Sequence, residues 1–140
     1  MLSHWPPCLP TPSCQETGHF TVPTIEALAA RCNYRCSNPD CRIPTTIPLR
    51  SPDRYANIGE AAHIKGRRAK SARYDPQQDS ADRSTASNGI HLCCNCHKLV
   101  DTSGTDEFSV EMLLQWKKDA EGVVIQRFYK THNNPSFDQN

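Results

Sequence analysis

The sequence predicts a small α+β domain that a bound zinc ion holds together. Four of the cysteines form two closely spaced pairs, a pattern typical of tetrahedral zinc sites. Short strand-like segments alternate with helical patterns along the middle of the chain. The 140 residues include 11 prolines and are only 36% hydrophobic, with a mean hydropathy of −0.67, so the apolar core is thin. A domain of this composition usually needs an additional crosslink to fold stably.

The chain divides into three parts. Residues 1–20 are rich in Pro, Ser and Thr without periodicity, so we expect a disordered, low-complexity N-terminal arm. Residues 21–125 contain the patterned segments and are expected to form the domain, and residues 126–140 are expected to form a C-terminal tail. Cys8 and Cys14 lie in the arm, far from the other cysteines, and we interpret them as incidental, with a second metal site as the alternative.

The sequence shows no export or membrane signal. Residues 1–20 lack the basic and apolar regions of a secretory signal peptide, and no apolar run approaches the length of a membrane span. We therefore expect a cytoplasmic protein with no membrane partner. In that reducing compartment, clustered cysteines bind metal more often than they form disulfides.

The first helix is predicted over residues 25–31. Thr24 can act as its N-cap, and Ile25, Leu28 and Ala29 follow helical spacing, so it is expected to be a packing helix. No feature of this segment suggests chemistry.

Two strands are expected next, one near the end of residues 55–64 that contains His63, and one that follows Gly89 and ends at Cys93. The polar residues 66–88 between them show no period. A loop of this length in a small domain is usually functional or mobile.

Two further helices are predicted. Residues 94–97 (CNCH) open the first, which continues to Asp101, and Ser109 can cap the second, from Val110 to about Glu121. The apolar positions of the second form one stripe that is expected to pack into the core: Leu113, Trp116, Ala120 and Val124.

A structural zinc site is predicted at the two cysteine pairs. The predicted ligands are Cys36, Cys41, Cys93 and Cys96. The turn residues 38–40 lie between the first pair, and the spacing of the second pair is usual for a zinc knuckle. Four thiolates close the coordination shell, and such a site can contribute on the order of 10 kcal/mol to folding. The adjoining Cys32 and Cys94 are alternative ligands.

A basic segment lies inside the polar loop. It contains no acidic residue between its first and last members, which are Lys65, Arg67, Arg68, Lys70 and Arg73. Although the net charge is only +1, a local cluster of this kind suits contacts to a phosphate backbone. The alternative interpretation is a solvated loop.

Three elements of the chain bring together a candidate catalytic group of His63, Asn88, His97 and Asp101. His97 and Asp101 are four residues apart on a predicted helix, so their side chains face the same way. An imidazole and a carboxylate near a second histidine can hold a divalent ion with open coordination positions. His91, between two apolar residues, is expected to be structural or substrate-facing.

The order of these residues resembles that of the HNH endonuclease family, also called the ββα-metal or His-Me finger nucleases. The resemblance covers roughly residues 30–121, and several motifs in the right order carry it. The matching stretches are CSNPDC (36–41), GEAAHI (59–64), RYDP (73–76), NGIHLCCNCHKLVD (88–101) and SVEMLLQWKKDAE (109–121). In detail, the chain resembles the HNH domain of bacterial anti-phage effectors, including those fused to SAVED sensor domains.

The resemblance implies a role for each catalytic residue. His63 is the general base that activates water, Asn88 orients the His63 loop, and His97 is a ligand of one catalytic divalent ion (Mg²⁺, Mn²⁺ or Ni²⁺). Asp101 occupies the position of a further ligand. Many members carry Asp or His directly before the base, where this chain has Ala62, so Glu60 is the candidate substitute.

The implied function is a metal-dependent endonuclease that cuts DNA, in an anti-phage or restriction-type system. DNA and an activating or targeting protein partner, or a second copy of the chain, are the expected partners. The alternative is a non-catalytic zinc module that binds nucleic acid or a protein, which Ala62 favours and the complete set of four polar residues opposes. A redox switch that uses Cys8, Cys14, Cys32 and Cys94 is the least supported hypothesis, because no pattern indicates a lowered thiol pKa.

Overall fold

The computed structural model describes residues 18–104 and 106–133 of the chain. Its elements, in chain order, are α1 (Val22–Arg31), β1 (Thr46–Pro48), β2 (Tyr55–Asn57), β3 (Gly59–His63), α2 (Ser80–Arg83), the 3₁₀ helix η1 (Ala86–Asn88), β4 (Gly89–Cys93), α3 (Cys94–Ser103) and α4 (Val110–Asn133). The predicted arm, including Cys8 and Cys14, lies outside the described residues up to residue 17, as do residues 134–140 of the predicted tail.

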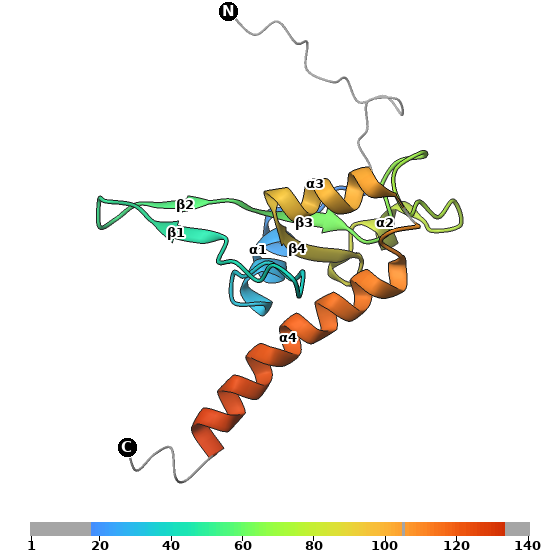
Figure 1. The fold of residues 1–140 in the computed structure, drawn as a ribbon. Coiled ribbons are helices and arrows are strands. Elements are labelled where there is room, and N and C mark those ends of the chain that lie inside the picture. The colour runs from blue at the N-terminus through green and yellow to red at the C-terminus, as the bar shows by residue number, and fades with distance from the viewer. Residues whose placement is uncertain (1–17, 105, 134–140) are drawn as a thin grey trace, which may run out of the picture.

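A ββα unit forms the centre of the molecule. β3 and β4 pair antiparallel, with Gly59 opposite Cys93 and His63 opposite Gly89. α3 follows β4 without a loop and packs on the same two strands, which α1 also contacts (Figure 1). The predicted small α+β class is therefore confirmed.

The core lies between this sheet, α3 and the beginning of α4. Ala62, Ile90 and Leu92 of the strands are fully buried against Val100 of α3 and Leu113 of α4. Leu113 and Ala120 of the predicted apolar stripe are buried, and Trp116 and Val124 are partly buried. The stripe is therefore a packing face, as predicted.

Both terminal helices differ from the prediction at their ends. α1 begins at Val22 because Thr21, not Thr24, is its N-cap, and the Thr21 hydroxyl accepts a hydrogen bond from the Thr24 backbone N–H at 3.3 Å. Pro23 is tolerated in the first turn, where its missing N–H has no helical partner to lose. α4 continues to Asn133, well past the predicted end and into the predicted tail, because Gly122 weakens a helix without ending it.

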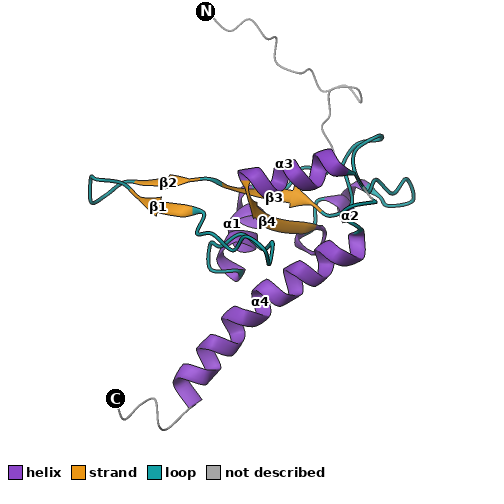
Figure 2. Cartoon of the chain, in the orientation of Figure 1, coloured by secondary structure: helices purple, strands orange, loops and turns teal. Residues whose placement is uncertain are grey.

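A hairpin that the sequence did not reveal projects from the ββα unit. β1 and β2 pair antiparallel from Thr46–Asn57 to Pro48–Tyr55 and extend away from the core (Figure 2). The turn closes through a hydrogen bond from the Arg54 N–H to the Ser51 carbonyl at 3.0 Å. The proline at the end of β1 and the short strand length concealed this hairpin from pattern analysis.

Among the helices of the described part of the chain, none combines the length and the apolar character needed to cross a membrane.

Candidate functional site

The four cysteines predicted as zinc ligands lie together. The Sγ atoms of Cys36, Cys41, Cys93 and Cys96 are all within 4.8 Å of one another, and those of Cys41 and Cys93 are 3.9 Å apart. Sulfur atoms bound tetrahedrally at about 2.3 Å from one ion would have this separation. The group is therefore positioned for metal binding and indicates a structural zinc.

Local hydrogen bonds shape the two halves of this cluster. Cys93 is the N-cap of α3, and its Sγ accepts a hydrogen bond from the Cys96 N–H at 3.4 Å. The side-chain amide of Asn38, in the predicted turn, donates to the Cys96 Sγ at 3.4 Å. Such donors orient thiolate ligands and offset their charge. Burial raises the pKa of Cys36 well above its usual range and that of Cys96 to about 11, so metal binding must displace their protons.

The two alternative cysteines do not join the cluster. The Cys32 thiol donates to backbone carbonyl groups in the last turn of α1 and to that of Arg35, beyond the helix, at 3.1 Å. Cys94 is exposed at the start of α3. Cys94 is two residues before the cluster member Cys96 on α3, so their side chains point about 200° apart around the helix.

His63 lies at the end of β3, where contacts hold its imidazole ring on two sides. Its Nε2 lies 2.6 Å from the carbonyl oxygen of Gly18, and its ring stacks on that of Phe20 with centroids 4.0 Å apart and planes 12° apart. A carbonyl only accepts hydrogen bonds, so Nε2 carries the proton and Nδ1 is the basic nitrogen of the neutral ring. Burial lowers the pKa of His63, which keeps this neutral form dominant at pH 7.

Asn88 links the segment after His63 to the start of β4. Its Oδ1 accepts from the Lys65 N–H at 2.9 Å, and its Nδ2 donates to the carbonyl oxygens of Lys65 and Arg83, both at 3.0 Å. The side chain is buried, so these bonds replace hydration and hold the chain on both sides of it. Asn88 therefore fixes the position of the segment that follows His63.

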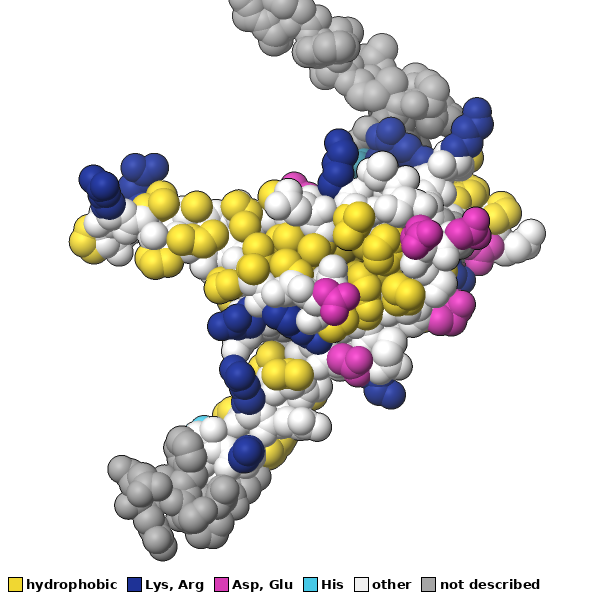
Figure 3. Space-filling view, in the orientation of Figure 1, with side chains coloured by type: hydrophobic (Ala, Val, Ile, Leu, Met, Phe, Trp, Pro, Cys, Tyr) yellow, Lys and Arg dark blue, Asp and Glu magenta, His cyan; other side chains and the backbone are white. Residues whose placement is uncertain are grey.

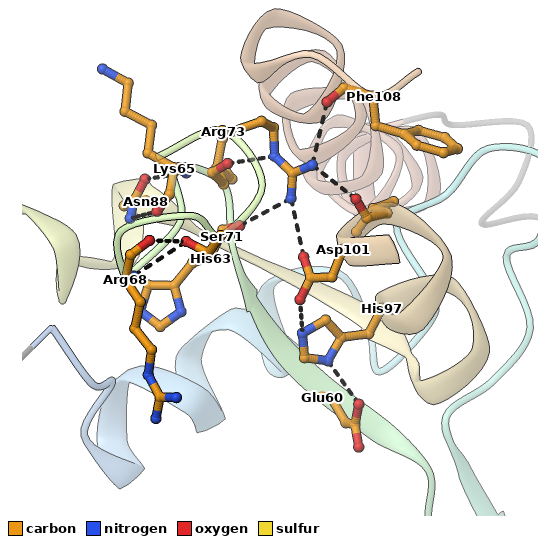
Figure 4. A network of polar contacts seen from close by, with 12 residues as sticks. Glu60, His63, Lys65, Arg68, Ser71, Arg73, Asn88, His97, Asp101 and Phe108 are labelled. Carbon is orange, nitrogen blue, oxygen red and sulfur yellow. Dashed lines mark hydrogen bonds and ion pairs between the residues drawn. The ribbon is translucent and has the colours of Figure 1, made fainter. Parts of the chain in front are cut away.

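His97, on the first turns of α3, lies between two carboxylates (Figure 4). Its Nε2 is 3.0 Å from Asp101 Oδ2, and its Nδ1 is 2.8 Å from Glu60 Oε1 on β3. The hydrogen bond to Asp101, with a smaller contribution from Glu60, raises the pKa of His97, and the imidazolium lowers that of Asp101.

The two carboxylates predicted as metal ligands, Asp101 and Glu60, lie on different sides of the His97 ring. In this structure Asp101 lies on the Nε2 side of the His97 ring, and Glu60 lies on the Nδ1 side. His97 Nε2 and Asp101 therefore face a common ion position, which Glu60 does not face. Ala62 is fully buried and offers no donor. Glu60 instead occupies the place of the carboxylate that commonly orients a metal-binding histidine.

Arg73 is buried and does not form part of a basic surface, contrary to the prediction. Its side chain is 0% exposed, and its Nη2 lies 3.2 Å from Asp101 Oδ1 (Figure 4). Further hydrogen bonds of the guanidinium group go to the carbonyl oxygens of His63, Ile64, Val100 and Phe108. A guanidinium group has five N–H donors in a fixed plane, so it can bind several acceptors at once. Arg73 therefore ties the end of β3 to α3 and to Asp101.

A cleft of about 410 Å³ joins the histidines and the basic loop. Among its lining residues are His63, His97, Asp101, Arg67, Arg68 and Lys70. In the space-filling view, basic side chains gather at the edge of the molecule beside the N-terminal end of the described chain (Figure 3). Lys65 does not line this cleft; it pairs with Asp75 at 3.1 Å and faces neighbouring pockets.

His91 has one of the two roles expected for it, and residues 18–20 have a role that was not expected. His91 is buried, and its Nε2 lies 2.7 Å from the Thr45 hydroxyl, so it is a structural residue.

Gly18, His19 and Phe20 were expected in a disordered arm, yet Gly18 and Phe20 contact His63 and His19 lines the cleft. One signal was present: an apolar residue directly before a helix N-cap commonly packs against the domain.

The comparisons with known proteins agree with this arrangement. Residues 36–103 match the family model described as HNH endonuclease, a span that begins at the first zinc ligand and ends with α3. No curated protein matches the chain. The order β3, β4, α3 is consistent with the ββα-metal fold of that family, and the match points to nuclease activity and a nucleic acid substrate.

Proposed function

Starting from the match to HNH endonucleases, we propose that this protein is a metal-dependent endonuclease that hydrolyses phosphodiester bonds in DNA. One observation carries the proposal: a single cleft is lined by a neutral histidine, a histidine–aspartate pair and three basic side chains. These are the parts that hydrolysis of a phosphodiester requires, namely a base, a cation site and a place for the phosphate backbone.

His63 is the proposed general base. Its Nε2 is held by the Gly18 carbonyl, so Nδ1 has the lone pair that accepts a proton from water. Asn88 holds both backbone groups of Lys65, two residues beyond the base, and so keeps the end of β3 in place. A base positioned in this way contributes about 10²- to 10⁴-fold to a hydrolysis rate.

His97 and Asp101 are the proposed ligands of a divalent ion such as Mg²⁺, Mn²⁺ or Ni²⁺. Their facing atoms are 3.0 Å apart on one side of α3, and an oxygen–nitrogen pair with open positions suits an ion that retains water or binds phosphate oxygens. When bound, such an ion stabilises the charge that develops on the phosphate and on the leaving oxygen. Glu60 holds the Nδ1 proton of His97 and so directs Nε2 toward Asp101.

Arg67, Arg68 and Lys70 are the proposed contacts to the nucleic acid backbone. They line the cleft together with His63, whereas Lys65 lines other pockets and Arg73 is buried. Backbone contacts of this kind carry little sequence information, so we expect weak sequence specificity from this domain. The resemblance to DNA-cutting HNH domains supports DNA as the substrate.

The proposed setting is a bacterial anti-phage or restriction-type system, in which the nuclease acts with a protein partner or as a homodimer. The far half of α4 supports an association, because Val123, Ile125, Phe128 and Tyr129 are exposed on it. Light scattering on the active sample tests this point, and full activity of a monomeric species would exclude it.

Replacing His63 by alanine is expected to reduce metal-dependent nicking of supercoiled plasmid by about 10²- to 10⁴-fold, because water then loses its base. The assay compares Mg²⁺, Mn²⁺, Ni²⁺ and EDTA. His132→Ala is the matched control, since His132 is exposed on α4 and contacts Phe128 rather than the cleft. Cleavage that survives in His63→Ala would exclude His63 as the base.

The nicking rate is expected to fall toward acidic pH with a midpoint below ~6.5, the ordinary pKa of histidine. Burial lowers the pKa of His63, so the base is lost only when the pH drops below that usual value. The rates must be measured at saturating metal, because His97, whose pKa is raised by its bonds to Asp101 and Glu60, must also lose a proton to bind an ion. A midpoint above pH 7 would contradict the assignment of His63.

The second candidate is a non-catalytic module that binds nucleic acid. The buried Ala62 favours it, because this strand position supplies no ligand and leaves two protein ligands at His97 and Asp101. A gel shift with no cleavage under any metal would support this alternative over the nuclease.

A further inference from the structure

The segment directly before α1 contacts the proposed base, although it lies outside the family match at residues 36–103. The Gly18 carbonyl is 2.6 Å from His63 Nε2, and the Phe20 ring stacks on the imidazole at a centroid distance of 4.0 Å. Thr21, the next residue, caps α1 and accepts from the Ile25 N–H through its carbonyl at 2.9 Å. The segment is thus anchored to a helix on one side and to His63 on the other.

Two glycines make room for these contacts. A Cβ atom on Gly89, which pairs with His63 across the sheet, would lie 3.0 Å from Phe20 Cζ and 2.5 Å from Leu28 Cδ1. The Phe20 ring therefore packs on the bare backbone of β4 while it covers His63. Gly18 is buried and has a φ of +81°, a conformation that favours glycine and that turns its carbonyl toward the imidazole.

We propose that residues 18–20 are a positioning element of the active site, in which the Gly18 carbonyl and the Phe20 ring hold the plane and the tautomer of the His63 imidazole. This inference rests on the proposed function of His63 as the base. Gly18 fixes the proton on Nε2, and Phe20 restricts rotation of the ring, so that Nδ1 keeps one orientation.

The contacts favour positioning over blockage of the base. They use Nε2 and one face of the ring, and among the described residues none forms a hydrogen bond with His63 Nδ1. The ring also lines the open cleft that contains His97 and Asp101. A segment that masked the base would instead cover the nitrogen that has to accept the proton.

The test compares Phe20→Leu and Phe20→Met, which keep an apolar side chain over Gly89 but remove the stacked ring, with Phe20→Tyr, which keeps it. Phe128→Leu on α4 is the matched control, because it removes an exposed ring that contacts Tyr129 and His132 and does not line the cleft. Each full-length variant is checked for wild-type thermal unfolding. Two quantities are then measured: the tautomer of His63 from imidazole nitrogen chemical shifts, and kcat and KM for plasmid nicking.

We expect Phe20→Leu and Phe20→Met to give mixed His63 tautomers and a kcat lowered by about tenfold to a hundredfold with little change in KM, as small misplacements of a catalytic group do. Phe20→Tyr and Phe128→Leu should retain the wild-type tautomer and rate. Unchanged tautomers, an unchanged kcat, or a kcat raised by removal of the ring would each overturn the proposal. Because the tautomer is measured without substrate, a wild-type protein that does not cleave DNA would sink the proposed function and still leave the positioning of His63 open to measurement.

Discussion

Loss of one zinc ligand is expected to unfold the domain, and Cys93→Ser is the most informative change. Cys93 ends β4, caps α3 and contributes one of four clustered sulfur atoms, so its thiolate joins the metal site to the central strand. Structural zinc contributes on the order of 10 kcal/mol to small domains, which is comparable to the whole stability of a typical fold at about 5–15 kcal/mol. Cys93→Ser should therefore lose cooperative thermal unfolding and the bound zinc together.

Cys94→Ser is the matched control for this experiment. Cys94 is the neighbouring residue and carries the same chemical group, but it is exposed and outside the cluster. Its replacement should change stability by less than about 0.5 kcal/mol. Circular dichroism and the zinc content per chain, measured on both variants, decide the matter. Wild-type melting and zinc content in Cys93→Ser would show that the four cysteines do not staple the fold.

Replacement of Arg73 by methionine is the second change with a large expected effect. The methionine fills much of the same space but leaves four backbone carbonyl oxygens and Asp101 without their donor. Asp101 is half exposed, so most of the cost comes from the carbonyl oxygens that lose their donor, at about 1–3 kcal/mol each, and we expect a total of about 3–5 kcal/mol. Urea unfolding should show a loss in this range, and the affinity for Mn²⁺ should fall because Asp101 is no longer held beside His97.

Arg73→Lys and Arg68→Met separate the causes of this effect. Lysine keeps the charge but has three donors in place of five, so an intermediate loss of stability is expected. Arg68 lies in the same loop and is exposed, so Arg68→Met should leave stability within about 0.5 kcal/mol of the wild type. A loss in Arg68→Met as large as in Arg73→Met would mean that the loop, and not the buried guanidinium, is responsible.

The contacts that the sequence predicted correctly are those between residues close together along the chain. The cysteine pairs predicted the metal cluster because short spacing alone brings two ligands to one ion. The four-residue interval between His97 and Asp101 likewise predicted that they would meet on α3. In both cases the information is local, so the sequence could supply it.

Residues whose role depends on distant contacts were not predictable in this way. Nothing in the local sequence distinguishes Arg73 from Arg67 and Arg68, which line the cleft. Arg73 is buried because it forms long-range hydrogen bonds to α3 and to Phe108. Glu60 was assigned as a ligand because of its distance from His63 along the chain, whereas its bond to Nδ1 of His97 depends on how α3 lies across β3. Residues 18–20 carry no periodic pattern, and their place against His63 follows from tertiary packing.

The positions of the zinc ligands along the chain have a consequence for how the molecule assembles. Cys41 and Cys93 close a long loop, and His63, Arg73 and Asn88 all lie within it. The entropic cost of closing a loop grows only slowly with its length. The free energy of metal binding, by contrast, becomes available only when the four ligands meet. We therefore expect metal binding and folding to occur as one cooperative transition. The concentration of available zinc should then set the fraction of chains that are folded, before any nucleic acid binds.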